Sequence, residues 1–282
     1  MALFKQVTIV GLGLMGGSLG MALRRRRLAK TVVGLSRTSS TLRRAKQRGA
    51  IDTGTTNAKQ AVRDADLVIL ATPVDTIVPL ALRFTNWMRP GSILTDVGST
   101  KATIVNALER RLPRHVAFVG GHPLAGSEQC GIASARADVL NGSMWILTAT
   151  SRTDRRALRA LARLCQSLVK RVIVMDPQRH DQLLAAVSHL PHLVAFCLVE
   201  ATADGALTVA PRSFLDATRV AKSDPELWDD IFFTNRAALL AAMRRFDQRW
   251  RMLRTQLARG DRAALRRVLT RAQVKRNALQ DH

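Results

Sequence analysis

The residues of this sequence whose types and spacing could do chemistry stand in three glycine-containing segments. These are Gly11-Leu12-Gly13-Leu14-Met15-Gly16, the segment DVGSTK at 96–101 and the segment GGHPLAGSE at 120–128. In the first, Gly11 permits a tight turn, Gly13 lets the backbone approach a pyrophosphate, and Gly16 allows a helix to pack closely on a strand. Free N–H groups at the start of that helix would face the phosphates. This segment, Leu14 and Met15 included, predicts a dinucleotide site in a nicotinamide-dependent dehydrogenase.

The choice between NAD and NADP is expected to depend on residues 36–38. An NAD site usually has an acidic residue about 20 residues after the glycines, where it accepts a hydrogen bond from the ribose 2′-hydroxyl. Here that place holds Ser36, Arg37 and Thr38. Hydroxyls and a guanidinium can bind a 2′-phosphate, which a carboxylate would repel. We therefore expect NADP rather than NAD. The expected cofactor site also includes Thr72, Pro73 and Ser99.

His122 is the candidate for a general base. A single histidine is more often structural, but His122 follows two glycines at a predicted strand end and precedes a proline. These neighbours favour a pre-organised imidazole. The segments that contain Ser99 and His122 both follow predicted strands, so both should line the crevice at the carboxyl edge of the sheet.

Short apolar runs alternate with helical patterns over the first 175 residues, as in a parallel sheet with crossover helices. The predicted strands cover 7–10, 31–35, 67–71, 92–97, 116–119, 144–148 and 171–175. Helical periodicity covers 18–26, 41–48, 74–87, 101–111 and 153–169. After residue 176 the pattern is of long helices, with a break around 205–213. We therefore predict an α/β protein with an N-terminal Rossmann-type doubly wound sheet (1–176) and an all-α domain (177–282).

The formal net charge of +23 raises the question of nucleic-acid binding. Aromatic residues make up only 4% of the chain, and no helix-turn-helix, zinc-finger or RNA-binding pattern stands in the sequence. Solvated arginine-rich helix faces are therefore expected, with no specific nucleic-acid partner.

The three cysteines, Cys130, Cys165 and Cys197, form no CxxC pair, which argues against a disulfide framework or a metal site. We find no secretory leader and no run of about 18 uninterrupted apolar residues, so we expect a cytoplasmic protein with no membrane partner. Phe246, Trp250, Leu253 and Leu257 fall on one stripe of the last long helical pattern. Such a stripe suits packing against a partner helix or a second subunit.

Over residues 7–240 the sequence resembles the prephenate and arogenate dehydrogenase family of tyrosine biosynthesis. The matching motifs are GLGLMGGS, DVGSTK, GGHPLAGSE, His180-Asp181, Ser188-His189-Leu190-Pro191-His192 and the stretch from Phe214 to Trp228. The resemblance implies a dinucleotide-binding domain joined to a helical dimerisation domain, and hence a homodimer. It also implies oxidation at a ring C4 hydroxyl coupled to loss of a carboxylate as CO₂.

The resemblance implies roles for the matching residues. His122 would accept the hydrogen bond of the 4-hydroxyl, Ser99 would bridge hydroxyl, histidine and nicotinamide, and Arg219 would clamp a substrate carboxylate. The other substrate-binding positions that it implies are Ser127, Glu128, Ser188, His189, His192, Glu226 and Trp228. His189 could equally brace the domain junction, and Trp228 could be a pocket wall.

The substrate side chain separates two activities within the family. Arogenate carries an ammonium group where prephenate carries a keto acid, so an acidic pocket residue such as Glu226 would favour arogenate. Residues 36–37 resemble those of cyanobacterial and plant arogenate enzymes, whereas His192 and Glu128 resemble residues of prephenate-using relatives. An NADP-dependent arogenate dehydrogenase is favoured. A prephenate dehydrogenase or dual-specificity cyclohexadienyl dehydrogenase is the alternative.

Two further classes of protein share some of these features. β-Hydroxyacid dehydrogenases and imine reductases have the glycine turn and a helical second domain, but they lack the HPLAGSE and SHLPH segments. A non-catalytic Rossmann protein that senses nucleotides or binds nucleic acid would fit the basic charge. The joint presence of Ser99, His122 and Arg219 counts against it.

Overall fold

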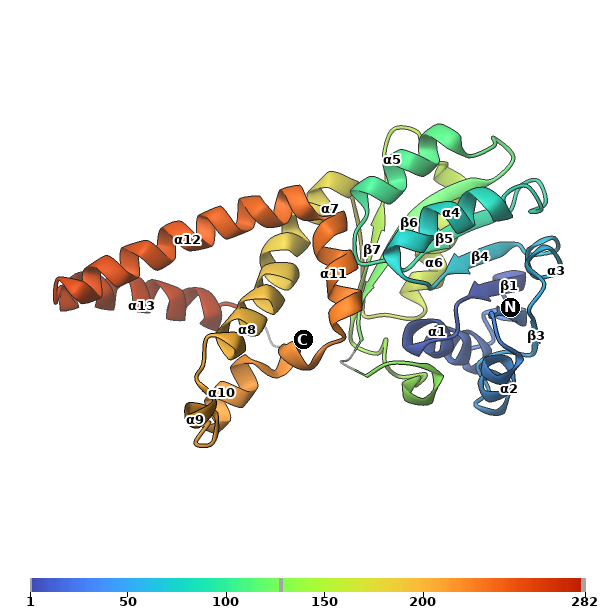
Figure 1. Ribbon diagram of the computed structural model, residues 1–282. Helices are drawn as coiled ribbons and strands as arrows, with labels where there is room; N and C mark the ends of the chain where they lie inside the picture. The colour runs from blue at the N-terminus through green and yellow to red at the C-terminus, as the bar shows by residue number, and fades with distance from the viewer. Residues whose placement is uncertain (1, 127–128, 280–282) are drawn as a thin grey trace.

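The computed structural model describes residues 2–126 and 129–279, and these form a sheet domain followed by a helical domain (Figure 1). The strands are β1 (Phe4–Val10), β2 (Ala29–Leu35), β3 (Thr53–Thr55), β4 (Leu67–Leu70), β5 (Ile93–Asp96), β6 (Ala117–Leu124), β7 (Met144–Thr148) and β8 (Arg171–Met175). Their order in the sheet is β3-β2-β1-β4-β5-β6-β7-β8. The strand order therefore reverses between β1 and β4, which is where a doubly wound sheet opens a crevice at its carboxyl edge. The predicted Rossmann-type fold is confirmed.

Two features of the sheet differ from the sequence prediction. The three-residue strand β3 has no apolar alternation and was not predicted. Strand β7 runs antiparallel to β6, whereas the other neighbouring strands are parallel. A parallel pair needs a crossover of a dozen or more residues, usually helical. Between β6 and β7 the described residues form only the short 3-10 helix Ile132–Ser134, so the chain turns back on itself.

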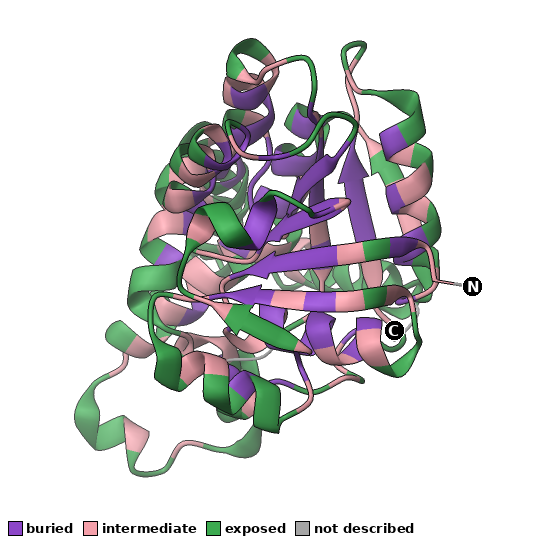
Figure 2. Cartoon of the chain, turned by 90° about the vertical axis from the view of Figure 1, so that its right-hand side faces the viewer, coloured by how far each residue is buried: buried purple, intermediate pink, exposed green. Residues whose placement is uncertain are grey.

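Helices cover both faces of the sheet and leave the central strands buried between them, whereas the edge strands β3 and β8 are partly exposed (Figure 2). They are α1 (Leu14–Arg25), α2 (Ser39–Gln47), α3 (Ala58–Val62), α4 (Val74–Phe84), α5 (Ala102–Arg111) and α6 (Arg155–Gln166). Helix α6 shows why these segments pack: it buries Ala157, Leu161, Leu164 and Cys165, which lie on one helical face. Asp154 caps its first turn by accepting a hydrogen bond from the Ala157 N–H.

The helical domain begins where Asp176 caps α7 (Pro177–Leu184) and Pro177 occupies the first turn. A π-helical turn, Ala185–His189, joins α7 to α8 (Leu190–Glu200). The predicted break contains the short helices α9 (Asp204–Leu207) and α10 (Arg212–Ala217), followed by a 3-10 turn at Arg219–Lys222. Helix α11 (Pro225–Thr234) packs against α4, while α12 (Arg236–Ala258) and α13 (Arg262–Asn277) project as a hairpin (Figure 1).

The stretch Pro177–Glu200 is one helical run of 24 residues with a mean hydropathy of 1.7. By length and composition alone it could span a membrane, and the count of uninterrupted apolar residues did not single it out. Only 22% of its most apolar window is buried in the chain. The buried part carries His180, Asp181 and His189, so its polar side chains serve the junction with the sheet domain.

Candidate active site

The glycine turn at the carboxyl end of β1 has the geometry that a dinucleotide needs. Gly11 has φ +88°, and a Cβ there would lie 2.4 Å from the carbonyl oxygen of Ala71. A Cβ on Gly16 would lie 1.9 Å from the Gly11 carbonyl oxygen, so α1 could not approach β1 with any other residue. Gly13 faces open space and caps α1 without a side-chain hydrogen bond. These observations fit a pyrophosphate bound by the first-turn N–H groups, beside Leu14 and Met15.

Further residues expected to bind the cofactor lie just after β2 and β4. Ser36 is half-buried and Arg37 is exposed. Thr38 caps α2, since its hydroxyl oxygen lies 3.4 Å from the Thr41 N–H and 2.9 Å from the Thr41 hydroxyl. Pro73 caps α4, and the Thr72 hydroxyl oxygen accepts a 2.8 Å hydrogen bond from Thr76. Both segments thus stand at the carboxyl edge on which Gly11 lies.

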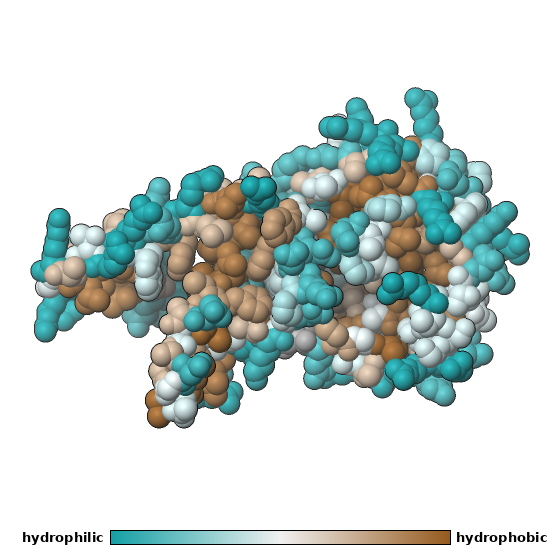
Figure 3. Space-filling model, in the orientation of Figure 1, coloured by the Kyte–Doolittle hydropathy of each residue, from teal (hydrophilic) through white to brown (hydrophobic). Residues whose placement is uncertain are grey.

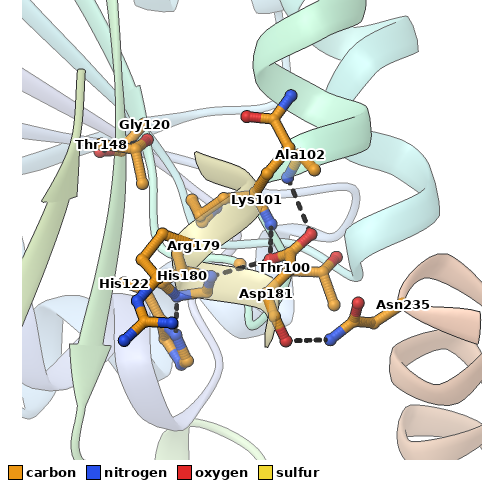
Figure 4. Close-up of polar contacts among 12 residues, drawn as sticks. Thr100, Lys101, Ala102, Gly120, His122, Thr148, Arg179, His180, Asp181 and Asn235 are labelled. Atoms are coloured by element: carbon orange, nitrogen blue, oxygen red, sulfur yellow. Dashed lines mark hydrogen bonds and ion pairs between the residues drawn. The ribbon is translucent and has the colours of Figure 1, made fainter. Parts of the chain in front are cut away.

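His122 lies near the carboxyl end of β6, where it is half-buried and pairs with Ile146 of β7. Its Nδ1 is 2.9 Å from Nε2 of His180, and the His180 Nδ1 is 2.7 Å from an oxygen of Asp181 (Figure 4). The pKa of His122 is held well below its ordinary value, first because burial removes solvent and then because of His180, Lys101 and His189 nearby. The imidazole is therefore neutral at physiological pH and can accept a proton.

Asp181 joins the two domains at this point. Its carboxylate accepts hydrogen bonds from the backbone N–H groups of Lys101 (2.8 Å) and Ala102 (2.9 Å), at the start of α5. Its carbonyl oxygen accepts from the side-chain amide of Asn235 at 2.8 Å. Figure 4 shows these residues converging from α5, α7 and the start of α12. A side chain of the helical domain thus caps a helix of the sheet domain.

The DVGSTK segment is tied down by a buried ion pair. The side chains of Asp96 and Lys101 are both fully buried and contact each other. Asp96 also accepts hydrogen bonds from the N–H groups of Gly98 (2.9 Å) and Gly121 (3.2 Å). The sequence placed the whole segment in the crevice lining, but of its polar residues only Ser99 is partly exposed. The ion pair therefore fixes the backbone on both sides of Ser99 and next to His122.

A second group of rings is formed by His189, His192 and Trp228. His192 stacks on Trp228 with ring centroids 3.6 Å apart, and its Nδ1–H donates to the Ser188 carbonyl oxygen at 2.9 Å. His189 is buried edge-on to Trp228 and lies 3.1 Å from the Asn235 amide. Burial lowers the pKa of His189 to about 4. The structure thus brings the SHLPH segment and Trp228 together.

The remaining predicted substrate residues are exposed or lie outside the described residues. Arg219 is exposed on its 3-10 turn. Glu226 is exposed in the first turn of α11. The pKa of the nearby Asp230 is raised, mainly by desolvation and further by the negative charges of Asp75, Asp229 and Glu226. Ser127 and Glu128 lie outside the described residues.

Sequence reasoning gave no role to His180, Asp181, Lys101 or Asn235. The motif His180-Asp181 was recognised, but its partners are distant in the chain: His122 is 58 residues away and Asn235 is 54 from Asp181. The only local signal is a pair of titratable residues in the first turns of the helix that opens the second domain.

Comparison with known proteins agrees with this architecture. The family model described as "Prephenate dehydrogenase, nucleotide-binding domain" matches residues 19–174, and "Prephenate dehydrogenase, dimerization domain" matches 176–271. The cyclohexadienyl dehydrogenase of Zymomonas mobilis is 33% identical over 100% of this chain and 99% of its own.

Two solved structures are similar over nearly their whole length. Prephenate dehydrogenase from A. aeolicus, in complex with hydroxyphenyl propionate and NAD⁺, has a TM-score of 0.91 at 33% identity and covers 98% of each chain. Synechocystis arogenate dehydrogenase has a TM-score of 0.83 at 31% identity, covering 96% of this chain and 99% of its own. With the glycine turn, the buried histidine pair and both family domains in one chain, this protein belongs to the prephenate dehydrogenase family of NAD(P)-dependent oxidoreductases.

Proposed function

We propose that this protein is an NADP-dependent arogenate dehydrogenase, which oxidatively decarboxylates arogenate to tyrosine. The observation that carries the proposal is His122, a neutral, half-buried imidazole beside the cofactor crevice. Prephenate is the second candidate substrate. It is favoured by the His192–Trp228 stack in the SHLPH segment and by the printed activities of the Zymomonas and A. aeolicus relatives.

For the matching residues we propose the roles that the family resemblance implies. A bound nicotinamide supplies the acceptor for the hydride that leaves the ring carbon of the substrate. His122 accepts the proton of the 4-hydroxyl as that carbon is oxidised, and Ser99 orients the hydroxyl toward it. Arg219 binds a carboxylate of the substrate through its guanidinium. The ring of His192 and the indole of Trp228 form an apolar wall. Loss of CO₂ then leaves the electrons of the broken C–C bond in the ring, and the resulting phenolate takes back the proton from His122 to give the aromatic phenol.

We expect Arg37→Ala to weaken NADP binding much more than NAD binding. Arg37 is exposed just after β2, where its guanidinium can pair with a 2′-phosphate that NAD lacks. A charge-assisted hydrogen bond contributes about 1.5–3 kcal/mol, or roughly 10- to 100-fold in the dissociation constant. Titration calorimetry with both cofactors measures the ratio, and Arg43→Ala, on α2, is the control. Equal losses of affinity for NADP and for NAD would show that Arg37 does not contact the 2′-phosphate.

Glu226→Gln is expected to shift substrate preference from arogenate toward prephenate. Glu226 is exposed at the start of α11 in an acidic environment that also contains Asp229 and Asp230. Such a field attracts the ammonium group of arogenate and repels the keto acid of prephenate. Steady-state rates on both substrates give the ratio of kcat/KM for arogenate to kcat/KM for prephenate. This ratio should fall about tenfold or more in the variant. Glu200→Gln, at the exposed end of α8, serves as the control. An unchanged ratio in Glu226→Gln would reject Glu226 as the selecting residue.

We further propose that the protein is a homodimer through its helical domain. Large apolar side chains are exposed on that domain, among them Val187 (71%), Trp250 (58%) and Leu257 (70%). Figure 3 shows apolar side chains gathered over the helical domain, and further apolar side chains among polar ones along the arm of α12 and α13. Contiguous apolar surface of this kind marks an interface. The family description of residues 176–271 as a dimerization domain supports the same assembly.

Trp250→Glu is expected to weaken the dimer enough to give monomers at micromolar concentration. A buried carboxylate without a partner opposes association, while an exposed one in the monomer costs little. Sedimentation equilibrium measures the mass, with Val174→Glu on the exposed side of β8 as the control. A wild-type chain that sediments as a monomer, or a Trp250→Glu chain with unchanged assembly, would contradict this interface.

A further inference from the structure

We propose that His180 and Asp181 are positioning residues that fix which ring nitrogen of His122 carries its proton, so that Nε2 is left as the base. The proposal rests on the proposed function in one respect, namely that His122 is the group that accepts the substrate proton. The relay itself is a property of the free protein. It consists of three side chains in series, joined by contacts of 2.9 Å and 2.7 Å.

The proton positions follow from Asp181, because its carboxylate can only accept a hydrogen bond. The Asp181 carboxylate has no hydrogen to donate, so Nδ1 of His180 must carry the proton of the 2.7 Å contact. A neutral His180 then has a lone pair on Nε2, which can only accept from Nδ1–H of His122. A neutral His122 with its proton on Nδ1 has its remaining lone pair on Nε2. The chain of contacts thus selects one tautomer at each ring.

The carboxylate at the end of the relay is itself held in place. Two backbone N–H groups at the N-terminus of α5 donate to it, and the positive end of the helix dipole favours the ionised form. Asn235 holds the Asp181 backbone from the helical domain. The His180 side chain is fully buried, which leaves it no alternative partner in solvent. The junction between the two domains therefore sets the geometry of the relay.

The carboxylate of Asp181 is the anion that the relay contacts directly, through His180. Lys101, which is paired with Asp96, and the rings of His180 and His189 disfavour a positive charge on His122, so the neutral ring is its resting form. When His122 takes up a proton, its Nδ1–H keeps donating to His180, and the positive charge lies two contacts from Asp181. Burial lowers the pKa of His180 while the hydrogen bond to Asp181 raises it, so His180 remains a neutral bridge. The arrangement orients the base without moving a second proton.

His180→Leu and His180→Gln test the relay as a pair. Leucine removes both contacts, so Nδ1–H of His122 loses its acceptor and the other tautomer, with its proton on Nε2, becomes favoured. We expect kcat to fall about a hundredfold, within the roughly 10²–10⁴-fold that a general base supplies, while KM changes little. Glutamine can accept a hydrogen bond from His122 and donate one to Asp181. The kcat of the glutamine variant should therefore be at least tenfold higher than that of the leucine variant. A leucine variant with wild-type kcat, or a glutamine variant no better than leucine, would overturn the proposal.

Nitrogen-15 NMR of the imidazoles supplies a readout that does not depend on turnover. The signals of His122 are assigned by their absence in His122→Asn. In the wild-type protein at pH 7.5 we expect a neutral His122 with its proton on Nδ1, and in His180→Leu a shift toward the Nε2–H form. A wild-type His122 with its proton on Nε2 overturns the relay even if the leucine variant does not fold. If instead His122→Asn turns over normally, the proposed function fails while the spectra still decide the tautomer.

Discussion

His122→Asn should fold and bind NADP but lose about 10²–10⁴-fold in kcat, the contribution of a positioned general base. Asparagine can still donate to His180 from its amide, so the side chain keeps its contact with the helical domain. It has no nitrogen that takes up a proton near neutral pH. The expected loss is therefore in the chemical step and not in cofactor affinity, and steady-state rates together with NADP titration separate the two.

A histidine outside the site provides the control for this variant. His115 lies before β6, at the end opposite to His122, and contacts the carbonyl oxygen of Thr85. His115→Asn is therefore expected to leave kcat within a factor of two or so of the wild-type value. Turnover at the wild-type rate in His122→Asn would reject His122 as the base, whatever the effect on stability.

The pH dependence of kcat/KM follows from the direction of the shift at His122. Only the neutral imidazole accepts a proton, so activity is lost as pH falls through the pKa of His122 in the free enzyme. Because burial holds that pKa well below its ordinary value, kcat/KM should be flat from pH 8 down through 6.5 and should fall only at more acidic pH. An acid limb centred at 6.5 or above would show that a solvated histidine, or another group, controls the reaction.

The sheet was predictable from the sequence because its strands are local patterns. Strands β4, β5 and β8 occupy nearly the predicted ranges, since their apolar runs are bounded by turn residues. The direction of β7 was not predictable in the same way. An apolar run of this kind occurs in both parallel and antiparallel pairs. The direction depends on the connection that precedes the strand, whose described residues form a 3-10 turn.

The candidate site likewise contains residues that the local sequence identifies and residues that it does not. Gly11, Gly16 and His122 could be picked out because neighbouring residues identify each of them: a strand before, a helix or a proline after. Lys101 and Asp181 could not, since their roles come from contacts across the fold. Lys101 looks like a crevice-lining cation in DVGSTK but is fully buried, and Asp181 acts on a helix N-terminus 80 residues earlier in the chain. Recognising a motif located these residues without revealing what they contact.

Lys101→Met is expected to lower the free energy of unfolding by about 3–5 kcal/mol, the cost of removing one member of a buried ion pair. Methionine fills a similar volume but leaves the Asp96 carboxylate fully buried with hydrogen bonds only from the N–H groups of Gly98 and Gly121. Two backbone donors do not replace the lost countercharge. Urea unfolding at a fixed protomer concentration measures the change, because assembly would otherwise alter the midpoint.

The double variant Asp96→Asn/Lys101→Met shows whether Lys101→Met is destabilised by the unpaired charge of Asp96 or by the loss of packing contacts. Asparagine is neutral, and its carbonyl oxygen can still accept from one of the two backbone N–H groups that Asp96 holds. If the penalty in Lys101→Met comes from the unpaired carboxylate, the double variant should be more stable than Lys101→Met, although it departs further from the wild-type sequence. Additive losses would mean instead that Lys101 stabilises the chain through packing alone.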